Sequence, residues 1–104
     1  MSIINETLSQ IKKATDYQLN KKILREKVKS DLHITHAGGL FLVTPALLTF
    51  LNSFDVEYLI VEDVYENPVK VNRQEFLTVA KEKYLSITDS WFNEHEKLRT
   101  IRRI

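Results

Sequence analysis

The residues most suggestive of chemistry lie in one short stretch, DLHITHAGGLFLVTP, from Asp31 to Pro45. It holds His33 and His36, two of the chain's three histidines, and both of its glycines, Gly38 and Gly39. Two histidines three residues apart on a helix could bind one metal ion, and a glycine-rich loop could cradle a phosphate group. The third reading is two β-strands joined by a turn.

The pattern of residue types favours two strands and a turn. Gly38-Gly39 lies between two β-rich runs, LHITHA and LFLVT, which is typical of a hairpin with a tight turn. With both glycines in the turn, we expect His36 opposite Phe41. An odd separation along a strand sends two side chains to opposite faces, so His33 and His36 are not expected to share a metal ion. The stretch also lacks the Lys-Ser/Thr that ends a phosphate-binding P-loop.

Carboxylates near the middle of the chain are the candidates for acid–base or metal-dependent hydrolysis: Glu57, Glu62, Asp63 and Glu66. Glu62 and Asp63 are adjacent, so a strand would point them apart. No E-x-K follows at strand spacing, and we interpret the group as an acidic strand end and turn facing solvent. We therefore predict no catalytic residue, no metal ligand and no cofactor, and expect that the chain is not an enzyme.

Length and composition point to one soluble domain spanning residues 1–104. Of the 104 residues, 43% are hydrophobic and 28% are charged, and the net charge is +1, as in ordinary globular proteins. The absence of cysteine excludes disulfides and thiolate catalysis, and it favours a reducing cytoplasm. We expect no signal peptide and no membrane contact, because no apolar run approaches the roughly 20 residues of a membrane span. The Lys-, Ile- and Asn-rich composition resembles that of small proteins of AT-rich genomes, including phages.

The periodicity predicts an α+β fold built from a few long elements. A long N-terminal helix runs from about Ile3 to about Lys29, and its apolar face comprises Ile4, Leu8, Ile11, Thr15, Leu19 and Ile23. The first β-hairpin, a short helix from about Pro45 to Ser53 and a second β-hairpin around the turn ENP follow, and then a long C-terminal helix. We expect a small antiparallel sheet to pack on the helices through Leu32, Ile34, Phe41, Val43, Tyr58 and Ile60.

The C-terminal helix carries the strongest sign of protein association. Asn72 and Glu75 form a capping-box pattern at its start, and an apolar seven-residue repeat follows, with Glu94 as its one polar member. The segment Ser86–Ser90 is a candidate kink. Aromatic and apolar side chains on this helix are the predicted protein-interface residues: Tyr84, Ile87, Trp91, Phe92, Leu98 and Ile101. Two terminal helices this long either pack on each other or project and pair with another copy.

Charge suggests an alternative partner. Met1 to Ser30 carries a net charge of +4, Asp31 to Asn72 −5, and Arg73 to Ile104 +2. The alternative to self-association is a nucleic-acid-associated accessory protein that uses basic residues of the terminal helices: Lys21, Lys22, Arg25, Arg99, Arg102 and Arg103. No nucleic-acid-binding motif is legible, so a homo-oligomeric interaction or assembly protein is the first hypothesis.

Overall fold

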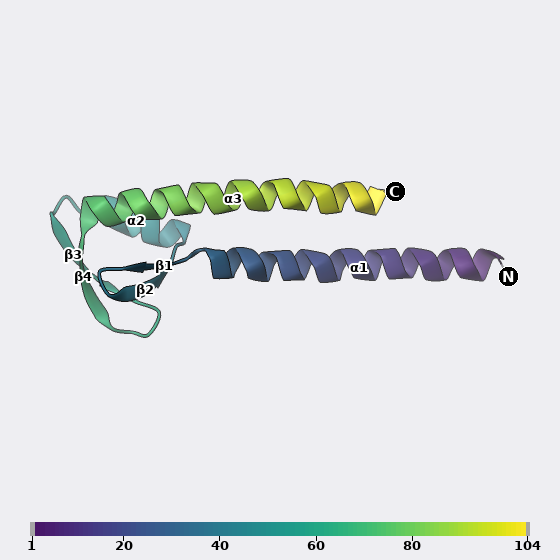
Figure 1. Cartoon of the computed structure of the whole chain (residues 1–104), viewed down its shortest axis with the longest axis horizontal. Coiled ribbons are helices and arrows are strands. Elements are labelled where there is room, and N and C mark those ends of the chain that lie inside the picture. Colours follow the sequence, from purple (N-terminus) through teal and green to yellow (C-terminus); the bar gives the residue numbers. More distant parts are fainter. Residues whose placement is uncertain (1, 104) are drawn as a thin grey trace.

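A computed structural model describes residues 2–103 of the chain, with side-chain environments for residues 10–100. The predicted α+β fold and element order are confirmed (Figure 1). The elements in chain order are α1 (Ser2–Asp31), β1 (His33–His36), β2 (Gly39–Leu42), α2 (Pro45–Ser53), β3 (Tyr58–Glu62), β4 (Pro68–Asn72) and α3 (Arg73–Arg103).

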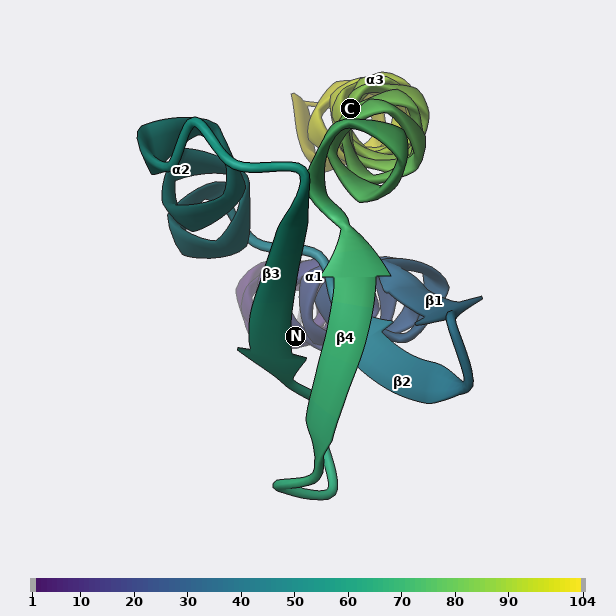
Figure 2. The same ribbon diagram turned by 90° about the vertical axis from the view of Figure 1, so that its left-hand side faces the viewer.

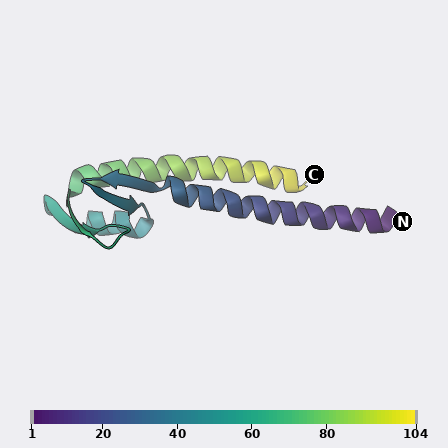
Figure 3. The same ribbon diagram turned by 60° about the horizontal axis from the view of Figure 1, so that its bottom comes forward.

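The molecule is elongated because the two terminal helices run side by side in opposite directions and away from the hairpins (Figures 1 and 3). Its principal extents are 69 × 23 × 18 Å, and its radius of gyration is 19.7 Å. A compact domain of this length has a radius of gyration of only about 13 Å. The N-terminal part of α1 extends beyond the C-terminal end of α3, so α3 covers only part of α1 (Figure 1).

The first hairpin forms as predicted, but its register differs from the expected one. His36 pairs with Gly39 and not with Phe41, because the two turn residues are Ala37 and Gly38. Both have positive φ, 50° and 86°, as a type I′ turn requires. Gly39 is instead a buried strand residue, and a Cβ atom there would lie 2.8 Å from Cγ2 of Val69. The second glycine therefore serves close packing and not the turn.

The second hairpin presents the opposite face from the one expected. β3 and β4 pair antiparallel with Leu59 opposite Val71, and Leu59 and Val61 turn toward the core. Tyr58 and Ile60 were expected to pack on the helices, but they are half or more exposed on the outer face. Side chains alternate along a strand, so burial of Leu59 and Val61 places the even-numbered residues Tyr58 and Ile60 on the outer face. The sheet itself is divided into two separate two-stranded sheets.

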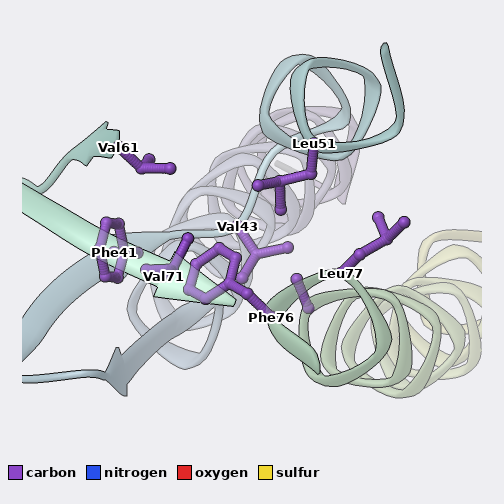
Figure 4. Packing of buried hydrophobic residues seen from close by; sticks show 8 residues of the cluster. Phe41, Val43, Leu51, Val61, Val71, Phe76 and Leu77 are labelled. Carbon is purple, nitrogen blue, oxygen red and sulfur yellow. The ribbon is translucent and has the colours of Figure 1, made fainter. Parts of the chain in front are cut away.

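The hydrophobic core lies between the two hairpins, α2 and the first turns of α3 (Figure 4). Phe76 of α3 is fully buried, and its ring centroid lies 4.7 Å from that of His36 and 4.8 Å from that of Phe41, both edge to face. The core members are Phe41, Val43, Leu51, Val61, Val71, Phe76, Leu77 and Ala80. The members of the core therefore come from Phe41 to Ala80, while α1 packs mainly against α3 and, to a smaller extent, against β1.

Local hydrogen bonds define where the helices begin. Oγ1 of Thr44 accepts from the backbone N–H of Leu47, and Oδ1 of Asn72 accepts from that of Glu75, so both predicted N-caps are confirmed. Arg73 then joins α3 to α2, since its Nε donates to the carbonyl of Val56 and its Nη1 to that of Leu51. The helix α3 continues without interruption through Ser86–Ser90.

Candidate interaction surfaces of the terminal helices

The face of α1 that packs against α3 is narrow. Leu24 is buried and Val28 is half-buried, and both border hollows between the helices together with Trp91 and Glu94. Nζ of Lys27 lies 3.3 Å from Oε1 of Glu94 across the same junction, and an exposed ion pair of this kind adds little stability. The sequence analysis did not predict this face of α1. The four-residue spacing between the apolar residues Leu24 and Val28 is the signal that could have indicated it.

The predicted apolar face of α1 points elsewhere. Ile11, Leu19 and Ile23 are 57%, 54% and 54% exposed, and we call these three residues the outer stripe. At about 100° per residue, they lie roughly 100–140° around the helix from Leu24. Thr15, between them, bonds its own helix through Oγ1 to the carbonyl of Ile11. The other two predicted members, Ile4 and Leu8, lie outside the residues with described side chains.

The predicted interface residues of α3 fall into two groups. Tyr84, Ile87 and Leu98 are half-buried on the side toward α1. Phe92 is 63% exposed and Trp91 39% exposed, so they remain available to a partner. Ile101 lies outside the residues with described side chains. Leu85, which the sequence did not single out, is exposed and lies seven residues before Phe92, on the same side of the helix.

A groove runs beside the junction of α1, α3 and the start of α2. It has a volume of about 500 Å³ and a largely apolar lining. Its floor comes from α1, the residue after α1, β2 and α3 and comprises Val28, Leu32, Leu42, Tyr84 and Trp91. Its rim comes from α1 and comprises Lys22, Arg25 and Lys29, with Glu26 as the one acidic lining residue. We call it the basic-rimmed groove. It combines apolar surface with positive charge at the edge.

The residues of the nucleic-acid alternative are divided by the structure. Lys22 and Arg25 border the basic-rimmed groove, and Lys21 is exposed nearby on α1. Arg99 lies on α3, next to Leu98, which shares a hollow with Asn20 and Ile23 of α1. Nη1 of Arg99 is 3.5 Å from Oε1 of Glu96. The side chains of Arg102 and Arg103 lie outside the described range. Three of the four described residues thus lie on α1, and the fourth lies on the neighbouring α3.

The histidines have structural contacts of their own. Nδ1 of His33 lies 2.9 Å from the carbonyl oxygen of Lys29 and 3.2 Å from that of Ser30, at the end of α1. A carbonyl oxygen only accepts, so this nitrogen is the donor and satisfies the helix end. His36 packs its ring against Phe76. Among residues 10–100, whose side chains are described, no three His, Asp or Glu side chains are grouped closely enough to hold a metal ion.

Asp63 differs from the solvent-facing carboxylate that the sequence suggested. Asp63 is only 8% exposed, and its Oδ1 accepts hydrogen bonds of 2.9 Å from the backbone N–H groups of Tyr65 and Asn67. Its own N–H donates to the carbonyl of Asn67. The neighbouring Glu62 is exposed on the other side of the strand. Asp63 thus organises the turn between β3 and β4.

Replacing Asp63 tests this turn-forming role. Asp63→Ala leaves two backbone donors without their acceptor, and we expect the free energy of unfolding to fall by about 1–3 kcal/mol. Asp63→Asn keeps a side-chain oxygen in the same place and is the matched control, with a loss of less than about 1 kcal/mol. Urea denaturation of the two variants measures the difference. Equal losses in both variants would contradict the role assigned to the oxygen.

Comparison with known proteins found no match to any protein-family model, to any curated protein or to any solved structure. Among residues 2–103, no helix is both long enough and apolar enough to span a bilayer.

Proposed function

We propose that this protein is a non-enzymatic assembly protein that associates with further copies of itself through its terminal helices. The observation that supports this proposal is the outer stripe of α1. Its three residues are each more than half exposed, and at about 100° per residue they lie roughly 100–140° around α1 from Leu24, the buried residue beside α3. Apolar residues that line up along one helix face are typical of a helix with a partner.

Helix length adds a second argument. α1 has 30 residues, and its N-terminal part extends beyond α3 (Figure 1). Isolated helices of this kind gain most of their stability from packing of an apolar face. A second copy related by a two-fold axis would cover the outer stripe with its own, because a two-fold interface pairs the same surface on both subunits. The four terminal helices of two copies would then form a bundle.

The exposed side chains of α3 fit the same arrangement. Leu85 and Phe92 lie one heptad apart on α3, and both are about two-thirds exposed. Aromatic residues are enriched at the centres of protein interfaces. A bundle of four helices gives these residues a partner surface that the single chain lacks.

Sedimentation equilibrium of the wild-type chain tests the proposal. We expect a mass that is a multiple of 12.2 kDa at micromolar concentrations and that falls toward 12.2 kDa on dilution. The elongated monomer would elute early from a gel-filtration column, so a method independent of shape is needed. A mass of 12.2 kDa across the whole concentration range would overturn the proposal.

A further inference from the structure

We propose that the basic-rimmed groove of one copy receives the turn between β3 and β4 of another copy. This inference rests on the proposed function, since both concern contacts between copies of the chain. The contact between groove and turn involves other residues than the outer stripe, and it is tested by a separate experiment. The groove and the turn match in polarity and in charge.

The groove defines what its occupant must look like. Its lining is largely apolar and includes two aromatic side chains, Tyr84 and Trp91. Three of its four charged lining residues are basic. A surface of this kind favours an occupant with an apolar or aromatic centre and negatively charged edges. Its volume of about 500 Å³ is enough for a few side chains and too small for a folded domain.

The turn between β3 and β4 has these properties. Tyr65 at its tip is 69% exposed, and Val64 beside it is 42% exposed. The acidic residues Glu62 and Glu66 flank them and are exposed as well. An exposed tyrosine next to a valine and between two carboxylates is the complement of an apolar floor with a basic rim. Tyrosine is also among the residues that most often anchor protein interfaces.

The turn is held in one conformation before any partner binds. Oδ1 of Asp63 accepts from the N–H groups of Tyr65 and Asn67, and the N–H of Glu66 donates to the carbonyl of Asp63. The N–H of Val64 donates to the carbonyl of Leu40, which joins the turn to the first hairpin. Rigid elements lose little conformational entropy on binding, so such a turn is well suited to insertion.

The position of the turn makes the contact intermolecular. The loop projects away from α2 and α3 at the far end of the second hairpin (Figure 2). Two different surfaces meet in this contact, so it is heterologous. Successive copies then form either a closed ring or an open chain, depending on the rotation between them.

A charge exchange tests the pairing. The groove variant combines Lys22→Glu with Lys29→Glu, and the turn variant combines Glu62→Lys with Glu66→Lys. All four positions are exposed, so both variants should fold. Each variant alone places like charges at the contact. We expect the dissociation constant of the contact between groove and turn to rise at least tenfold. Mixing the two restores opposite charges at both possible contacts and should restore association.

Trp91 reports on the groove directly, because it is the only tryptophan in the chain and lines the groove. We expect its emission to change with protein concentration in the wild type. Tyr65→Ala should shift this change to concentrations about thirtyfold higher, the size expected for a buried tyrosine anchor. Tyr58→Ala is the matched control, since Tyr58 is half-exposed on the outer face of the same hairpin. It should leave the change where it is.

The inference would be overturned if the mixture of the two charge variants associated no better than either variant alone, or if the Tyr65 and Tyr58 substitutions had equal effects. It would also be overturned if Trp91 emission responded to decanoate, an amphipathic anion, but not to protein concentration. The inference and the proposed function are tested by different measurements. Trp91 emission reports whether the groove is occupied, whereas sedimentation of outer-stripe variants reports whether the terminal helices associate.

Discussion

Leu19→Glu combined with Ile23→Glu is expected to convert the associated protein into a folded monomer. Burial of two such side chains contributes about 3–6 kcal/mol per copy, and placing carboxylates in an apolar contact adds a desolvation penalty. A loss of this size weakens association by a hundredfold or more. The folded monomer should survive, because both positions are more than half exposed within the chain.

Sedimentation equilibrium measures the change in mass, and far-ultraviolet circular dichroism measures whether α1 stays helical. The matched control is Gln10→Glu combined with Ala14→Glu. These two exposed residues lie about 140–180° around α1 from Leu19 and Ile23 and receive the same added charge. The control should keep the wild-type mass. If the Leu19/Ile23 variant sediments like the wild type, the outer stripe is not the contact between copies.

Phe76→Ala is expected to destabilise the domain by about 3–5 kcal/mol, the largest effect of any single substitution proposed for this chain. Phe76 is fully buried, and its ring contacts those of His36 and Phe41 across the core. Its removal leaves a cavity where α3 meets the first hairpin. Small domains have a total stability of only about 5–15 kcal/mol, so much of it would be lost.

Urea denaturation followed by circular dichroism measures this loss. Phe54→Ala is the matched control, because Phe54 follows α2 and is 44% exposed. We expect its cost to be well below half that of Phe76→Ala. Phe76→Leu keeps most of the buried volume and should recover part of the stability. Equal costs for Phe54→Ala and Phe76→Ala would contradict the position of the core.

Local signals in the sequence were sufficient for the elements. Apolar residues every three or four positions predicted α1 and α3, and the N-caps at Thr44 and Asn72 placed the starts of α2 and α3. These signals are reliable because the interactions behind them join residues that are close in sequence. The kink considered at Ser86–Ser90 does not occur, and Oγ1 of Thr88 instead bonds the carbonyl of Tyr84 within the helix.

Details that depend on contacts between distant residues could not be predicted in this way. In the observed register of the first hairpin, Gly39 lies in the strand, where Val69 and Phe41 leave no room for a Cβ atom. The outward direction of Tyr58 and Ile60 follows from the burial of Val61. Each outcome is set by packing against a residue from another element, which periodicity alone does not identify.

The sequence by itself determined that the chain is α+β, that it begins and ends with long helices and that its charges separate into basic ends and an acidic middle. Only the tertiary structure decided which face of α1 is buried. Two apolar faces compete for α3, and the side that carries Leu24 packs against it while the outer stripe stays exposed. The reason is that burial depends on which partner surface is within reach, and one helix can cover only one side of another.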